Sequence, residues 1–255
     1  MPRPLVVLLH GVGLDRTMWR PVTALLDDEF EVLALDLLGH GAHRPAPAGT
    51  TLRDLADDVA VQMAAAALPG RAHLVGFSLG ALVAQHLARH RPELVASLTS
   101  VCSVCRRTEA ERTSVLSRLA GAEADFPASV EASLRRWYDG TGVDPELVRQ
   151  TRETLLGNDV ESYLSCYRVF ATGDAEIGPE LPRITTPALA ITGELDPGST
   201  PDMTRRLAEA LPDCRAVVVP GARHMLPVQM PREFVTSLTT FIRETGRAES
   251  NVAAV

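Results

Sequence analysis

Residues 76–80 read Gly-Phe-Ser-Leu-Gly, and this stretch decides the fold. The apolar run 73–75, His-Leu-Val, precedes it, and the helix-favouring run 81–88, Ala-Leu-Val-Ala-Gln-His-Leu-Ala, follows it. This order predicts a strand, a tight turn and a helix, with Ser78 at the apex. Two glycines suit such a turn because side chains at positions 76 and 80 would collide where strand and helix cross. The pattern alone is a weak signal, so its flanks must decide.

Apolar runs of strand length lie before and after this turn in the chain. Each is continuous rather than alternating, which is typical of strands covered on both faces. Helical patterns separate most of the runs, so the order of elements predicts an α/β fold with a doubly wound, mostly parallel sheet. The runs are 5–9, 32–35, 94–101, 186–193 and 216–219.

The segment 103–181 breaks this rhythm. It has no strand pattern, and its amphipathic stretches have helical spacing. We therefore predict a helical cap at 103–181, inserted into one core that is formed by 1–102 and 182–246. The last residues, 247–255, are expected to be disordered.

Composition disfavours several classes of partner. A formal charge of -7, with Lys and Arg scattered along the chain, provides no basic field for nucleic acid. The apolar run at 5–9 is too short for a signal peptide or a spanning helix, so we expect a cytoplasmic protein without membrane association.

Four cysteines do not make a disulfide framework, and we interpret Cys102 and Cys105 as buried thiols rather than a zinc or redox pair. A monomer or homodimer that acts on a small molecule is expected.

The chemistry of serine directs the search for partners of Ser78. A serine hydroxyl is a poor nucleophile at neutral pH and needs a base, together with a group that orients the base. His224 and Asp196 each follow a predicted strand, and the carboxyl ends of parallel strands share one edge of the sheet. We therefore predict Ser78, His224 and Asp196 as a catalytic triad. Asp174 and Asp202 remain alternatives for the acid.

These features together resemble the α/β-hydrolases over nearly the full length of the chain. The matching features are the loop His10-Gly11-x-Gly13, the Gly-x-Ser-x-Gly turn and the order Ser, Asp, His of the triad. The resemblance implies that the backbone N–H groups of Val12 and Leu79 form an oxyanion hole. It implies neither a cofactor nor a metal.

Shorter segments narrow the resemblance. Haloalkane dehalogenases and epoxide hydrolases of this fold carry aspartate at the turn, so their chemistry is not expected here. Segments 181–187 and 224–231 are similar to those of 3-oxoadipate enol-lactonases, and 134–138 resembles their Arg-Trp-Phe segment. An acidic substrate would need a cationic partner in its pocket. The candidate substrate-binding residues are Trp137, Arg135, Arg136 and Met225.

Two positions depart from related patterns. The C–C bond hydrolases of meta-cleavage pathways usually have Trp after the catalytic histidine, where this chain has Met225. In the proteins that this chain resembles, the loop after the second strand usually reads Gly-His-Gly-x-Ser. Here it ends in Ala42-His43, and His43 is expected to face solvent.

The preferred hypothesis is a cofactor-independent serine hydrolase that cleaves a small ester or lactone, of the enol-lactone kind, through an acyl-enzyme. Within enzymes, the alternatives are a C–C bond hydrolase of a meta-cleavage-type dienoate and an acyltransferase with the same triad. From another class, the chain could be a non-catalytic ligand-binding protein with the α/β-hydrolase fold.

Overall fold

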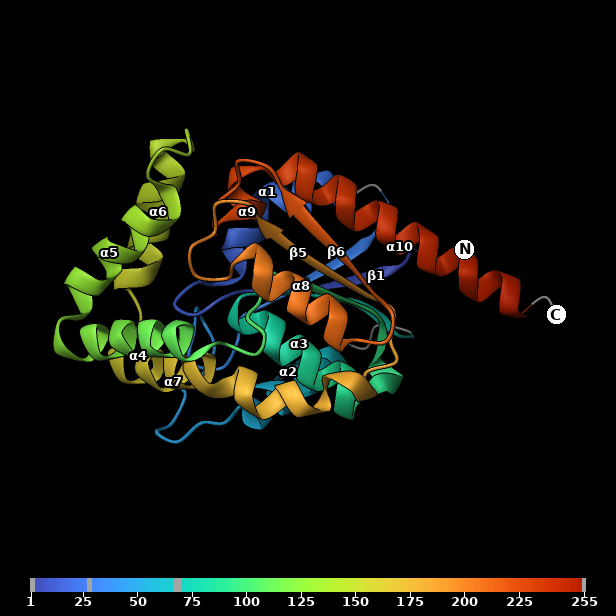
Figure 1. Cartoon of the computed structure of the whole chain (residues 1–255), viewed down its shortest axis with the longest axis horizontal. Helices are drawn as coiled ribbons and strands as arrows, with labels where there is room; N and C mark the ends of the chain where they lie inside the picture. Colours follow the sequence, from blue (N-terminus) through green and yellow to red (C-terminus); the bar gives the residue numbers. More distant parts are fainter. Residues whose placement is uncertain (1–2, 27–28, 67–69, 254–255) are drawn as a thin grey trace.

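A parallel sheet forms the centre of the protein, whose computed structural model describes residues 3–26, 29–66 and 70–253. The strands in these residues are β1 (Leu5–Leu9), β2 (Glu31–Leu35), β3 (Ala72–Phe77), β4 (Val95–Val101), β5 (Ala188–Gly193) and β6 (Cys214–Val219). They form a six-stranded sheet in the order β2-β1-β3-β4-β5-β6, and every neighbouring pair is parallel. The predicted parallel sheet is therefore confirmed (Figure 1).

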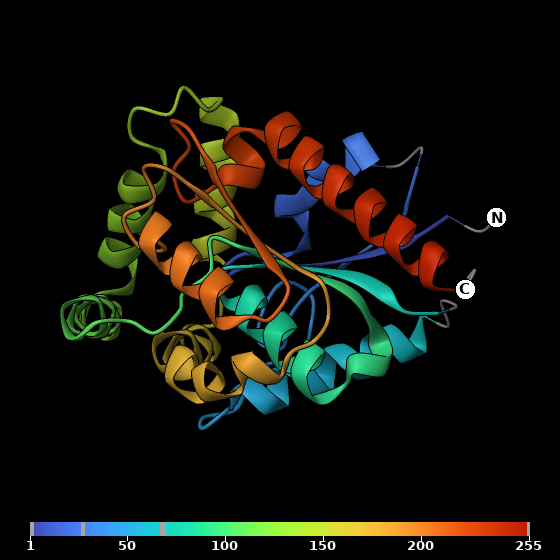
Figure 2. The same cartoon turned by 45° about the vertical axis from the view of Figure 1, so that its right-hand side comes forward.

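Helices cover both faces of the sheet. Figure 1 and Figure 2 show α1 (Arg20–Leu26) and α10 (Pro231–Ala253) on one face, and α2 (Leu52–Ala65), α3 (Leu79–His90) and α8 (Pro201–Ala210) on the other. No helix in the described part of the chain has the length and hydropathy needed to cross a membrane. The short elements are α9 (Leu226–Gln229) and the 3₁₀ helices Arg16–Trp19, Pro92–Leu94 and Gly178–Arg183.

The core beneath the turn at 76–80 is aromatic. The side chain of Trp19 is fully buried, and its ring centroid lies 6.5 Å from that of Phe77 and 6.1 Å from that of Phe234. The three rings come from the 3₁₀ helix Arg16–Trp19, from β3 and from α10. Burial of large aromatic rings is a strong stabilising contribution, so the end of β3 has rigid support.

Four helices lie together beyond the carboxyl ends of the strands (Figure 1). Asp174, on the last of these helices, holds the segment that leads into the first one. Its Oδ2 accepts from the backbone N–H of Arg107 at 2.9 Å, and its Oδ1 accepts from the Arg107 guanidinium at 2.6 Å. Both side chains are almost completely buried. The boundaries of the cap, 103–181, stay a prediction. The helices are α4 (Glu109–Ala124), α5 (Phe126–Tyr138), α6 (Pro145–Leu156) and α7 (Val160–Ile177).

Helix α10 corrects the expectation of a disordered tail at 247–255. It continues to Ala253, so the expectation fails for 247–253, and residues 254–255 lie outside the described part. Gly246 costs a helix only about 1 kcal/mol relative to alanine, and no proline follows it. The residues after it, which include Ala248 and Glu249, favour helix, so the glycine does not end α10.

Candidate active site

Ser78 lies between β3 and α3 in a strained backbone conformation. Its φ of 54° and ψ of -110° are rare for a residue with a side chain. Backbone hydrogen bonds hold this conformation: the N–H of Ser78 donates to Val101 O at 2.9 Å, and the N–H of Gly80 donates to His10 O at 3.1 Å. The structure thus has the sharp turn that the sequence predicts.

The two glycines of the turn have no room for a side chain. A Cβ placed on Gly76 would lie 2.1 Å from Gly80 O, and a Cβ on Gly80 would lie 2.5 Å from Leu9 O. Both contacts are with backbone atoms, which cannot rotate away. Glycine is therefore required where β3, α3 and β1 approach one another.

We expect Gly76→Ala to lower the free energy of unfolding by roughly 1–3 kcal/mol, because the added methyl group overpacks this crossing. Urea denaturation followed by circular dichroism measures the change. The matched control is Gly121→Ala, since Gly121 lies within α4 and a Cβ there meets no atom within 4 Å. Alanine at this helical position should stabilise by about 0.5–1 kcal/mol. Equal stability of Gly76→Ala and the wild type would contradict the close approach.

Asp196 and His224 form a buried hydrogen-bonded pair. Nδ1 of His224 lies 2.7 Å from Oδ2 of Asp196, and the exposed fractions of the two side chains are 8% and 0%. Oδ1 of Asp196 accepts from the N–H groups of Gly198 at 2.8 Å and Ser199 at 2.9 Å. Because a carboxylate only accepts, this contact places the imidazole proton on Nδ1 and leaves the lone pair of Nε2 free.

Aromatic rings hold the imidazole of His224 from two elements. Its centroid lies 5.0 Å from that of Phe77, next to the turn, and 5.5 Å from that of Trp137, on α5. The interplanar angles are 49° and 31°. Trp137 therefore links α5 directly to His224, which restricts the orientation of the imidazole ring.

One cavity brings most of the predicted residues together. It encloses about 590 Å³ of space free of protein atoms, its solvent-facing mouth included, which suits a small molecule. Ser78, His224 and Asp196 line it from three different strand ends. The other lining residues that bear on the predictions are Val12, Trp137 and Arg136, with aromatic side chains from Tyr163, Tyr167 and Phe170.

Two predicted substrate-binding residues do not line this cavity. Arg135 is exposed, because neighbouring residues on a helix point in directions about 100° apart. Met225 is fully buried in the hydrophobic core. Sequence reasoning also missed Arg118, which does line the cavity from α4. A signal existed, since Arg118 borders the buried positions Val115 and Leu119.

The predicted oxyanion-hole residues belong to two separate segments. Leu79 is the first residue of α3, so its N–H has no acceptor within that helix. Val12 lies in the loop after β1 and lines the same cavity as Ser78. The N-terminal end of a helix carries a partial positive charge, which favours negative charge beside Leu79.

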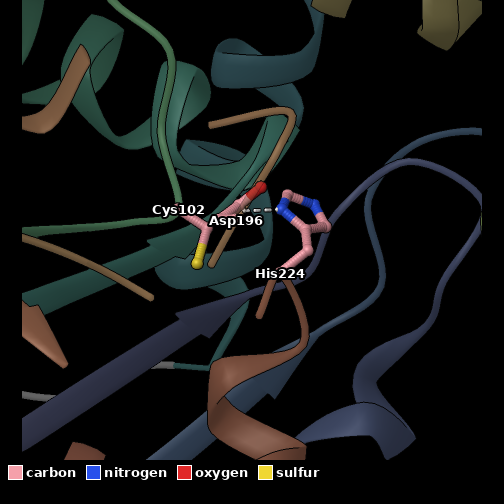
Figure 3. Close-up of side chains that lie close together, drawn as sticks. All are labelled: Cys102, Asp196 and His224. Carbon is pink, nitrogen blue, oxygen red and sulfur yellow. Dashed lines mark hydrogen bonds and ion pairs between the residues drawn. The ribbon is translucent and has the colours of Figure 1, made fainter. Parts of the chain in front are cut away.

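Cys102 also lies beside the His224–Asp196 pair. Its Sγ and one ligand atom each of Asp196 and His224 lie within 4.8 Å of one another (Figure 3). Burial, with the charge of Asp196, raises the pKa of the Cys102 thiol well above its ordinary value. The thiol therefore stays protonated, while both carboxylate oxygens of Asp196 already accept hydrogen bonds. This donor set fits a His–Asp pair better than a metal site, and the burial predicted for Cys102 and Cys105 is confirmed.

The loop histidines have structural contacts. Nε2 of His10 accepts from the N–H of Leu37 at 2.9 Å, and burial lowers the pKa of His10 to about 4. Burial likewise lowers the pKa of His40 to about 3. His43 does not simply face solvent as expected, because its Nε2 contacts Oδ2 of Asp58 at 2.8 Å. This contact holds His43 against α2, because Asp58 belongs to that helix.

Known proteins are similar to this chain in sequence and in architecture. The (E)-2-((N-methylformamido)methylene)succinate hydrolase of Acinetobacter baylyi is 29% identical over 240 residues, which cover 94% of this chain and 90% of that protein. The 3-oxoadipate enol-lactonase 2 of the same organism is 28% identical over 233 residues, covering 91% of this chain and 86% of that protein. The crystal structure of the enol-lactonase from Burkholderia xenovorans LB400 superposes with a TM-score of 0.85 at 29% identity, covering 95% of this chain and 92% of that one.

The family assignment follows from the whole chain rather than from the turn alone. The parallel sheet, the strained Ser78 and the His224–Asp196 pair match the architecture that the sequence predicts. Residues 6–237 match the alpha/beta hydrolase family, and the chain belongs to this family.

Proposed function

We propose that this chain is a cofactor-independent serine hydrolase that cleaves a small ester or lactone, of the enol-lactone kind, through an acyl-enzyme. The observation that carries the proposal is the 2.7 Å contact between His224 and Asp196 in the cavity that Ser78 also lines. A free Nε2 lone pair on an oriented imidazole is what a serine nucleophile requires. The similarity of this chain to enol-lactonases supports the lactone class.

The proposed reaction begins at Ser78. Nε2 of His224 takes the hydroxyl proton as Oγ forms a bond to the carbonyl carbon, and the carbonyl electron pair moves onto oxygen. The N–H groups of Leu79 and Val12 hold this oxyanion, and loss of one such donor typically costs about 100-fold to 1,000-fold in rate. Collapse of the intermediate breaks the bond to the leaving oxygen, which receives the proton from His224.

Water completes the cycle. His224 removes a proton from a water molecule, whose oxygen attacks the acyl carbon, and the second tetrahedral intermediate releases the acid and restores Ser78. Asp196 orients His224 and stabilises the imidazolium in both half-reactions. The rings of Phe77 and Trp137 pack beside this imidazole and limit its rotation.

A panel of substrates tests the proposed function. Loss of ultraviolet absorbance follows hydrolysis of an enol-lactone and, separately, of a meta-cleavage dienoate, while 4-nitrophenyl acetate reports general esterase activity. We expect turnover of the enol-lactone and of the acetate, and none of the dienoate. Consumption of the dienoate alone would assign C–C bond hydrolysis instead. Acyl transfer to an added alcohol in preference to water would assign an acyltransferase, and binding without turnover would assign a ligand-binding protein.

Cytoplasmic location and a monomeric or homodimeric state stay predictions from the sequence.

A further inference from the structure

Two arginines from the cap region line the cavity that holds Ser78 and His224. Arg118 comes from α4 and Arg136 from α5, and both side chains are half-buried. Asp196 is the only carboxylate among the residues that line this cavity, and both of its oxygens already accept hydrogen bonds. The cavity therefore has more cationic than anionic groups available to a ligand.

Neither arginine forms an ion pair within the described residues. Arg136 donates from Nη1 to Ala132 O at 3.3 Å and from Nη2 to Ser133 Oγ at 2.9 Å, which are neutral acceptors on its own helix. Arg118 donates from Nη1 to Ser114 Oγ at 2.8 Å. A guanidinium has further N–H donors beyond these, so both side chains keep donors for a ligand.

The other arginines of the segment 103–181 show that carboxylates are not scarce there. Five of them pair with Asp or Glu, whereas the half-buried Arg118 and Arg136 have no such partner in the described part of the chain. The five paired arginines are Arg107, Arg112, Arg149, Arg152 and Arg168.

The two cavity arginines also repel each other. Burial lowers the pKa of Arg136, and the charge of Arg118 lowers it further. An arginine guanidinium carries a positive charge in proteins at neutral pH. Like charges in a partly desolvated site raise the free energy of the empty cavity. An anion bound in this cavity would offset the repulsion.

We propose that Arg118 and Arg136 form a carboxylate-binding subsite, so that the substrate is an anionic ester or lactone whose carboxylate lies away from the bond that is cleaved. This inference rests on the proposed function for the reacting end of the cavity. A guanidinium matches a carboxylate through paired, charge-assisted hydrogen bonds. Hydrolysis of such a substrate yields a second carboxylate. The expected product is therefore a dicarboxylate when the substrate is a lactone, or when the acyl part of the ester carries the first carboxylate.

The kinetic test compares monomethyl adipate, whose distal group is a carboxylate, with dimethyl adipate, whose distal group is an uncharged methyl ester. In Arg118→Gln and Arg136→Gln, we expect kcat/KM for monomethyl adipate, measured by pH-stat, to fall about 10-fold to 100-fold, mainly through KM. Dimethyl adipate should lose less than monomethyl adipate, because its distal methyl ester has no charge to pair with a guanidinium. The matched control is Arg135→Gln, because Arg135 is exposed and outside the cavity, and it should change neither substrate. Equal losses on both esters, or no loss on monomethyl adipate, would overturn the subsite.

Direct binding separates this inference from the proposed function. Titration calorimetry with adipate should show binding to the wild type and to Arg135→Gln, and at least about tenfold weaker binding to Arg136→Gln. If 4-nitrophenyl acetate is hydrolysed but adipate does not bind, the subsite is wrong and the hydrolase proposal stands. If adipate binds through Arg136 but no ester is cleaved, the subsite stands and the hydrolase proposal fails.

Discussion

Ser78→Ala is expected to lower kcat for 4-nitrophenyl acetate by about 10,000-fold to 1,000,000-fold, the range seen when a triad nucleophile is removed. Alanine keeps the backbone turn but has no oxygen to attack the carbonyl carbon. Release of 4-nitrophenolate measures the rate, and thermal unfolding shows whether the variant keeps its fold.

The control for this variant is Ser117→Ala, since Ser117 is exposed on α4 and does not line the cavity. It should keep the wild-type rate. A folded Ser78→Ala variant that hydrolyses the ester at the wild-type rate would show that another group performs the reaction.

Asp196→Asn should lower kcat by about 10,000-fold while the protein stays folded. An asparagine can still accept from the N–H groups of Gly198 and Ser199, so the loop keeps its hydrogen bonds. Its amide NH2 then faces Nδ1 of His224 and donates to it, which moves the imidazole proton to Nε2. A protonated, neutral Nε2 cannot take the proton of Ser78, so the nucleophile is not activated.

Asp202→Asn provides the comparison for this loss. The sequence leaves Asp202 as an alternative for the triad acid, but the structure places its exposed side chain in the first turn of α8. We expect wild-type kcat for this variant. Asp174, the remaining alternative, is instead engaged by Arg107. Retention of more than about a tenth of the wild-type kcat by Asp196→Asn would contradict the assignment, because a triad acid contributes far more than this.

The elements that position the site could be predicted because local physics determines them. A continuous apolar run of strand length is typical of a strand covered on both faces, and parallel strands place the loops that follow them at one edge. Those two facts were enough to bring Asp196 and His224 to the edge where Ser78 lies. The glycines at 76 and 80 were predictable as well, because their backbone approach excludes a side chain.

Side-chain directions at the cavity could not be predicted in the same way. Arg135 and Arg136 are adjacent in sequence, yet only Arg136 lines the cavity, and this depends on how α5 packs against α4 and α6. Arg118 lies outside every recognised motif and reaches the cavity only through the packing of α4. Met225 follows His224 directly but is buried on the other side of the loop, in the core.

The central claim, that Ser78 is a nucleophile activated by His224, is tested most directly by a fluorophosphonate, which bonds covalently to an activated serine oxygen. Peptide mapping by mass spectrometry after labelling locates the adduct. We predict one adduct, on the peptide that contains Ser78, with labelling much slower in Asp196→Asn. No adduct on folded wild-type protein, or an adduct on a different residue, would contradict the account.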